Sequence, residues 1–368
     1  MNNRNISIYI HVPFCAGKCP YCDFYSKYPA GREIDAYVNA IKNRVAGYAE
    51  KYRRPVSTVY FGGGTPSLLG GERLAEILTA VKNGFKVENG AEITVEANPD
   101  SVDAAFFQRI AKAGFNRVSM GLQSANEDEL RFLGRKHGTD QVEKAVKWAG
   151  DAGIGNISLD LMMGLPGQNE EMVRRSMDFC ASLPVPHISS YILKIEEGTP
   201  FYRQKITLPD DDRVSELYLY SVNYLKSLGY SQYEISNFSR PGFESRHNLQ
   251  YWRCLEYIGI GPSAHSFMEG RRFYFGGDLN AFIDGADPEE DGDGGGFEEF
   301  AMLNLRLARG LQAEDCAERF EKGGDLYGKA RQRAAQLPDK LVRATEERIS
   351  LTAEGFLVSN AVILKILG

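Results

Sequence analysis

The sequence predicts an α/β protein in which an open parallel sheet of six strands is followed by a smaller, mostly helical unit. Two observations support this fold class. Up to about residue 200, short apolar runs alternate with amphipathic helical patterns, as in parallel strands joined by right-handed helical crossovers. Beyond that point the alternation stops, and a glycine-rich acidic segment precedes the C-terminal part of the chain. Six strands are too few to close an eight-stranded barrel.

The strand and helix patterns follow one another in a regular order. The first predicted strand, residues 6–11, leads into a loop with three cysteines and then into a helix over residues 33–52. The other predicted strands cover residues 57–61, 92–96, 117–120, 156–161 and 187–193, and the helices between them begin near residues 71, 101, 126 and 169.

Composition divides the chain further. We expect four segments: a core over 1–200, an extension of that core over 201–283, a flexible acidic linker over 284–296, and a C-terminal unit over 297–368. The extension is predicted to contain a helix over 209–228 and strands over 230–238 and 257–260. In the last unit, a strand–turn–strand over 341–351 and a helix over 352–367 resemble a winged helix.

Composition and charge also exclude several function classes. The 368 residues are 43% hydrophobic and 25% charged, as in an ordinary soluble protein, and no apolar run approaches the ~20 residues of a membrane span. A net charge of −6, without basic clustering in the C-terminal unit, argues against nucleic-acid binding. With six cysteines, three of them isolated, and no signal-peptide pattern, we expect a cytoplasmic protein with reduced thiols.

Cys15, Cys19 and Cys22 are the strongest chemical signal in the sequence. Their C-x3-C-x2-C spacing on one loop can turn three soft thiolates toward a common centre, which favours an iron–sulfur cluster or zinc. A structural zinc site normally has four ligands, so three cysteines favour a cluster with one open iron. A zinc site completed by His11 and a reduced redox thiol cluster are the alternatives.

Polar and glycine residues follow the other predicted strands. Gly62-Gly63-Gly64-Thr65-Pro66 follows the second strand, while Glu96, Gln123 and Asp160 lie at the ends of the next three. Because chemistry in βα proteins collects at the carboxyl ends of the strands, we expect one site there. Taken singly, the glycines could form a tight turn and the polar residues could be caps or surface groups.

The cysteine loop resembles the signature of the radical S-adenosylmethionine (SAM) superfamily. The resemblance implies an open (β/α)6 partial TIM barrel, a [4Fe–4S] cluster on Cys15, Cys19 and Cys22, and SAM on the open iron, from which one electron produces a 5′-deoxyadenosyl radical. The Gly-Gly-Gly-Thr-Pro stretch resembles the element that holds the methionine amino group of SAM. The SAM contacts that the resemblance implies are Tyr9, Tyr21, Gly63, Gly64, Thr65, Glu96, Gln123, Arg135 and Asp160.

Within that superfamily the chain is similar to the oxygen-independent coproporphyrinogen III oxidase-like family over almost its whole length. The opening Tyr9–Cys15, the glycine motif and Gly259–His265 carry this similarity. The oxidases read C-x3-C-x2-C-x-C and carry an N-terminal arm, whereas here Phe24 takes the fourth cysteine position and about five residues precede the first strand. Both departures weaken the oxidase interpretation and favour the family's haem chaperone branch.

A second motif supports that branch. The stretch His247-Asn248-Leu-Gln-Tyr251-Trp252 matches the H-N-x-x-Y-W pattern of the haem chaperones, which implies haem binding by His247, Asn248, Tyr251 and Trp252. A neutral imidazole can bind haem iron, and the two aromatic rings offer flat apolar faces for a porphyrin. The alternative from the residues alone is that His247 caps a helix whose Tyr and Trp belong to the core.

Two hypotheses therefore remain. The first is a haem chaperone that passes haem to an acceptor protein, and the second is a coproporphyrinogen III oxidase that decarboxylates propionates through the deoxyadenosyl radical. The expected cofactors are the [4Fe–4S] cluster, SAM and haem. Expected partners are haem or a related tetrapyrrole, an acceptor protein, and an electron donor such as flavodoxin or ferredoxin. A homodimer and transient contact with a membrane surface stay open.

Overall fold

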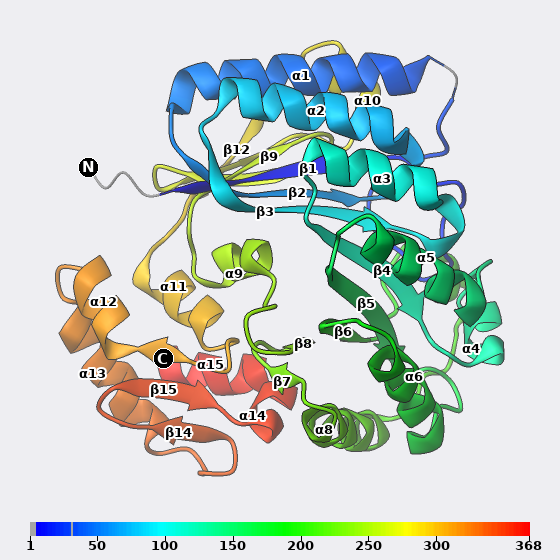
Figure 1. Ribbon diagram of the computed structural model, residues 1–368. Coiled ribbons are helices and arrows are strands. Elements are labelled where there is room, and N and C mark those ends of the chain that lie inside the picture. The colour runs from blue at the N-terminus through cyan, green and yellow to red at the C-terminus, as the bar shows by residue number, and fades with distance from the viewer. Residues whose placement is uncertain (1–4, 31) are drawn as a thin grey trace.

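A computed structural model describes residues 5–30 and 32–368. Its centre is a curved sheet of twelve strands in the order β12-β11-β10-β9-β1-β2-β3-β4-β5-β6-β8-β7 (Figure 1). The six predicted parallel strands lie side by side within it: β1 (Ile6–Val12), β2 (Val56–Gly63), β3 (Val87–Ala97), β4 (Arg117–Gln123), β5 (Asn156–Met163) and β6 (His187–Ile192). The predicted α/β fold class, with its open parallel core, is confirmed.

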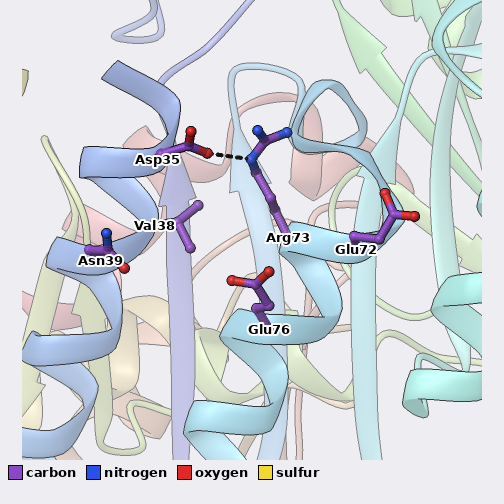
Figure 2. A pocket seen from close by; sticks show the side chains of 6 residues that line it. All are labelled: Asp35, Val38, Asn39, Glu72, Arg73 and Glu76. Atoms are coloured by element: carbon purple, nitrogen blue, oxygen red, sulfur yellow. Dashed lines mark hydrogen bonds and ion pairs between the residues drawn. The ribbon is translucent and has the colours of Figure 1, made fainter. Parts of the chain in front are cut away.

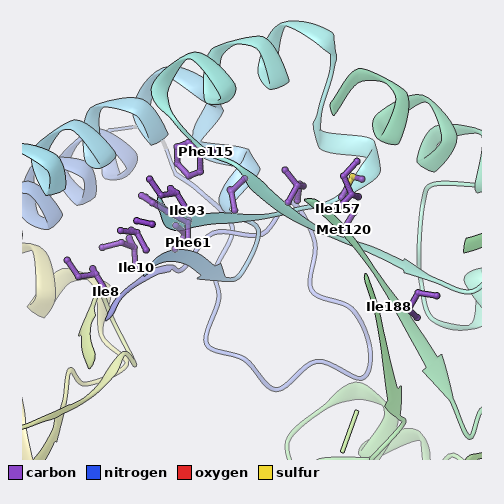
Figure 3. Close-up of a cluster of buried hydrophobic side chains, with 14 of the residues drawn as sticks. Ile8, Ile10, Phe61, Ile93, Phe115, Met120, Ile157 and Ile188 are labelled. Carbon is purple, nitrogen blue, oxygen red and sulfur yellow. The ribbon is translucent and has the colours of Figure 1, made fainter. Parts of the chain in front are cut away.

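Helices cover the outer face of the curve (Figure 1). They are α1 (Glu33–Tyr52), α2 (Gly70–Gly84), α3 (Ala104–Ala113), α4 (Glu127–Phe132), α5 (Thr139–Asp151) and α6 (Glu170–Ser182), with short 3-10 turns η1 (Pro66–Leu69) and η2 (Pro99–Ser101). The core fills the layer between helices and sheet, where Ile10, Phe61, Ile93 and Ile157 pack (Figure 3).

The inner face of the sheet is polar. Side chains alternate along a strand, so where Ile93 and Val95 pack under the helices, Glu92, Thr94 and Glu96 face the inside of the curve. The same alternation in the neighbouring strands brings further buried polar residues to that inner face: Ser7, His11, Thr58, Arg117, Ser119, Ser158, His187 and Ser189. Polar side chains therefore line the inside of the open barrel.

Residues after the core extend both edges of the same sheet. On one side β9 (Tyr257–Ile260) pairs parallel to β1 and is followed by antiparallel β10 (His265–Met268), β11 (Arg271–Tyr274) and β12 (Glu289–Asp293). On the other side β8 (Asn237–Ser239) pairs with β6 and then with β7 (Ser231–Gln232). The prediction of one strand over 230–238 is wrong, because the chain reverses between these two short strands.

The predicted flexible linker over 284–296 is also wrong in its central part. Glu289–Asp293 forms β12, the edge strand of the large sheet. Its acidic side chains meet partners on β11: Arg271 bonds Glu290 and Asp293, and the Tyr274 hydroxyl donates to Glu289 at 2.9 Å. Cross-strand charge pairing therefore orders a segment that cannot build an apolar core.

Most of the remaining helices lie on the lower side of the sheet in Figure 1, whereas the helix over Leu279–Ile283 packs against α1. The remaining helices are α7 (Pro200–Gln204), α8 (Asp211–Ser227), α9 (Arg246–Trp252), α10 (Leu279–Ile283), α11 (Phe297–Asn304), α12 (Ala313–Arg319), α13 (Gly323–Ala334), α14 (Ala353–Leu357) and α15 (Ser359–Leu367). A small sheet joins β13 (Leu311–Gln312), β15 (Arg348–Leu351) and β14 (Val342–Ala344). The single last helix that the sequence predicts is instead two, α14 and α15. In the described part of the chain no helix could cross a membrane.

Candidate functional site

The cysteine loop begins directly after β1, at the carboxyl end of the sheet. Its base is fixed by backbone hydrogen bonds, in which Cys15 N donates to Lys27 O at 3.0 Å and Lys27 N donates to Pro13 O at 2.8 Å. A turn with Cys22 N donating to Cys19 O at 3.1 Å shapes its tip. All three predicted cluster cysteines are free thiols of intermediate exposure, so they can reach a ligand from one short segment.

The three thiols do not form a ready position for a single metal ion. Among residues 5–30 and 32–368, no three His, Cys, Asp or Glu side chains converge on a position for one metal ion. A [4Fe–4S] cluster takes each thiolate on a different iron atom and needs no such convergence. His11 does not complete a zinc site as placed, because its Nδ1 lies 3.0 Å from the Tyr9 hydroxyl and its Nε2 lies 3.1 Å from Tyr25 O.

The glycine turn after β2 lies against this loop. Gly64 N donates to Val12 O at 2.8 Å and Thr65 N donates to Phe14 O at 2.7 Å. A Cβ on Gly63 would come within 2.6 Å of the His11 ring, and one on Gly64 within 2.6 Å of Phe14 O. Glycine is therefore required at both positions, since the backbone approaches its neighbours too closely for any side chain.

Two half-buried carboxyls lie on β3 and β5. Glu96 accepts hydrogen bonds from the Tyr60 hydroxyl at 2.8 Å and from Gly63 N at 3.2 Å, and burial raises its pKa to about 7. Asp160 accepts from Ser119 Oγ at 3.2 Å, and burial raises its pKa to about 6. A cationic ligand such as an ammonium group would favour the ionised form of both.

Arg135 connects the remaining polar residues of the site. Its guanidinium donates to the Tyr21 hydroxyl at 2.8 Å and to Asn98 Oδ1 at 3.1 Å, and Asn98 in turn donates to Thr65 Oγ1 at 3.4 Å. Thr65 Oγ1 lies 3.4 Å from Cys15 Sγ, so the network reaches the cysteine loop. The Nε of Arg135 is buried without a partner among the described residues, which suits a ligand carboxylate.

Gln123 lies in the same cluster under backbone strain. Its φ of 68° is in the left-handed region, which a non-glycine residue adopts at a cost. A Cβ on Gly121 would meet the Gln123 amide at 2.6 Å and the Arg135 guanidinium at 3.3 Å, so the two side chains share that space. Strain of this kind at a strand end is typical of a functional residue.

Most of the predicted SAM residues thus lie at one edge of the sheet. The hydroxyls of Tyr9 and Tyr21 have different hydrogen-bond partners there. Tyr21 bonds Arg135, while the Tyr9 hydroxyl bonds His11, and burial raises the pKa of both phenols. Sequence reasoning missed Asn98 and Tyr60. Asn98 immediately precedes Pro99 and the turn η2, a position that could have marked it as a site residue.

The haem motif forms α9, which lies inside the curve of the sheet (Figure 1). His247 is 1% exposed, with Nδ1 2.7 Å from Thr58 Oγ1 and Nε2 2.8 Å from the Tyr251 hydroxyl. As placed, the imidazole would have to give up one of these bonds to bind iron. The alternative from the residues alone is wrong about the cap, because Ser245 caps α9 by accepting from Asn248 N at 3.4 Å. His247 is nevertheless held by bonds within the fold, while Asn248, Tyr251 and Trp252 are half-buried and do not belong to the core.

One surface hollow lies away from this chemistry. Figure 2 shows a 380 Å³ pocket between α1 and α2, lined by Asp35, Val38, Asn39, Glu72, Arg73 and Glu76. Arg73 donates to Asp35 there at 2.8 Å. The pocket lies on the outer helical layer, where charged side chains pair with each other. It is therefore separate from the site at the strand ends.

A three-cysteine loop, a glycine cradle and half-buried carboxyls near the carboxyl ends of an open (β/α)6 sheet are typical of a radical SAM protein. A model of the Radical SAM superfamily matches residues 9–180. The protein called heme chaperone HemW in Lactococcus lactis is 35% identical over 98% of this chain and 97% of its own length. Its namesake in Mycobacterium tuberculosis is 36% identical over 100% of this chain. The chain therefore belongs to the HemW family of radical SAM proteins.

A solved structure is similar over almost the whole fold. Coproporphyrinogen III oxidase (HemN) from Escherichia coli, described as a radical SAM enzyme, superposes with a TM-score of 0.84 over 99% of this chain and 90% of its own. The sequence identity is 21%, so this similarity shows the fold alone. Family membership implies a [4Fe–4S] cluster and SAM, and the thiols, the glycine cradle and the orphaned Arg135 Nε fit both.

Proposed function

We propose that the protein is a haem chaperone, which binds haem and passes it to an acceptor protein. The observation that carries the proposal is the 35% identity to a heme chaperone HemW over 97% of that relative's length. Phe24 supports it, because this residue takes the place of the fourth cysteine of the oxidases and is 64% exposed beside the cluster loop. The cysteines are free thiols, which supports a reducing compartment such as the cytoplasm.

In this proposal the site holds SAM next to the cluster. When both are bound, they would supply one-electron reductive cleavage of SAM to methionine and a 5′-deoxyadenosyl radical, with the electron taken from an external donor. Cys15, Cys19 and Cys22 would hold the cluster, and the buried Arg135 Nε–H would donate to the SAM carboxylate. Glu96, with the backbone of Gly63 and Gly64, binds the methionine amino group, while Gln123, Asp160 and the remaining predicted contacts enclose the nucleoside. An electron donor such as flavodoxin would dock at the exposed cysteine loop.

The second candidate function is oxidative decarboxylation of coproporphyrinogen III, which the similarity of Tyr9–Cys15 and Gly259–His265 to the oxidase-like family implies. Anaerobic turnover separates the two candidates. The reconstituted protein is incubated with SAM, reductant and coproporphyrinogen III, and chromatography detects protoporphyrinogen beside an authentic oxidase. Haem transfer to an apo-acceptor is measured in parallel. We expect transfer without turnover, whereas product at a rate near that of the oxidase would overturn the chaperone proposal.

The raised pKa of Glu96 predicts a pH dependence of stability. The folded carboxyl holds its proton up to about pH 7, whereas the unfolded one loses it near pH 4.5. Between these pH values the native state therefore binds more protons than the unfolded state. The contribution of Glu96 to the free energy of unfolding is fully present below pH 4.5 and is lost as the pH rises through 7. Urea unfolding of the ligand-free protein from pH 4.5 to 8 should show this fall, and Glu96→Gln should reduce it. Equal slopes for both proteins would contradict the assignment.

A further inference from the structure

The helix α9 has two faces with different surroundings. Its inner face is fixed, because Glu92 accepts from Arg246 N at 3.0 Å and from His247 N at 2.9 Å while His247 bonds Thr58 and Tyr251. Its outer face is open. A groove of 590 Å³ runs along it, lined by Asn5, Ser57, Glu88, Arg246, Leu249, Gln250, Arg253 and Leu255.

The groove combines apolar contact with positive charge. Leu249 and Leu255 line it together with two exposed arginines, Arg246 and Arg253, which are seven residues apart and so about 10 Å along the helix axis. Arg253 has no side-chain hydrogen bond or ion pair within the described part of the chain. Arg246 uses one nitrogen, which donates to Gly90 O at 2.6 Å. The one carboxylate in the lining, Glu88, accepts from Asn5 Nδ2 at 2.6 Å.

These features match a flat apolar molecule with two acid groups along one edge. The volume lies within the range of about 300–1,000 Å³ that is usual for cofactor sites. Arginine forks bind carboxylates through charge-assisted hydrogen bonds. Among the described residues that line the groove, none is a histidine, cysteine or methionine, so the groove offers no usual ligand for haem iron.

We infer that this groove binds the porphyrin of haem, with the ring against Leu249 and Leu255 and the two propionates on Arg246 and Arg253. The inference rests on the proposed haem-binding function and deepens it. Recognition then depends on the ring and its carboxylates and not on the iron. The face of α9 that carries the contacts is the one opposite His247, which keeps its structural role.

The test compares three probes: haem, iron-free protoporphyrin IX, and the dimethyl ester of haem, whose propionates carry no charge. Each is titrated, by absorbance or by quenching of protein fluorescence, into wild type, the double variant R246Q/R253Q and the matched control R175Q/R343Q. The control removes two exposed arginines outside the groove. Thermal unfolding checks that the three proteins are equally folded.

We expect wild type and control to bind haem and iron-free protoporphyrin with similar affinity. R246Q/R253Q should bind both at least tenfold more weakly, and the ester should bind wild type and variant equally. Equal binding of haem by the variant and wild type would overturn the groove as the site. Haem binding that requires iron and is lost in His247→Ala would overturn it in favour of ligation. If wild type binds no haem at all, the proposed function fails as well.

Discussion

Replacing Cys15, Cys19 or Cys22 by alanine is expected to remove the iron from the reconstituted protein. The three free thiols are the proposed cluster ligands, and a variant with two cannot hold the three irons that need protein ligands. Iron and sulfide content after anaerobic reconstitution, together with the brown visible absorbance, measures the loss. We expect each single variant to retain less than about a tenth of the wild-type iron.

The matched control is Cys316→Ala, which removes a buried thiol far along the chain from the loop. It should keep the full iron content. Elemental analysis for zinc belongs in the same experiment, because zinc in place of iron in wild type would favour the single-ion alternative. Full iron content in all three loop variants would show that the cluster is not held by this loop.

Replacing Glu92 is expected to destabilise the fold by about 3–5 kcal/mol, the range found when a buried charge loses its main opposite charge. Glu92 is 4% exposed and accepts hydrogen bonds from two backbone amides at the start of α9. It is also the foremost negative neighbour of Arg117, which is 2% exposed and whose Nε finds no partner in the described structure. Glu92→Leu would therefore leave a buried cation uncompensated. Urea unfolding followed by circular dichroism measures the change.

The double variant Glu92→Leu/Arg117→Leu tests whether charge is the cause. Replacing both members of a buried pair by apolar residues is often neutral or stabilising, so the double variant should recover stability relative to Glu92→Leu. A double-mutant cycle with Arg117→Leu gives the coupling between the two side chains. Additive losses in the cycle would mean that Glu92 acts through the α9 amides alone.

The core could be predicted from the sequence because its signals are local. Each parallel strand carries its own apolar alternation, and the site residues lie in the C-terminal half of the strands, as Glu96 and Asp160 do. The β12 strand could not be predicted in this way. Its acidic sequence has no strand pattern, and only pairing with Arg271 and Tyr274 on β11 orders it.

The orientation of α9 also could not be predicted from the sequence. The spacing of His247 and Tyr251 puts both side chains on one helix face, and either an inward or an outward face was consistent with it. The choice depends on contacts with Thr58 and Glu92, residues more than 150 positions earlier in the chain. Asn98 was missed for a similar reason, since its importance comes from Arg135 and Thr65 on other segments.

Tyr60 contacts both Glu96 and the helix α9. Its hydroxyl donates to Glu96 of the proposed SAM site, and its ring stacks on His247 of α9 with centroids 5.0 Å apart. A ligand that shifts Glu96 therefore acts on a side chain on which the haem motif rests. By thermodynamic linkage, the factor by which SAM changes the affinity for haem must equal the factor by which haem changes the affinity for SAM. Binding of haem and binding of SAM would then affect each other equally, and the Tyr60 side chain would connect the two sites.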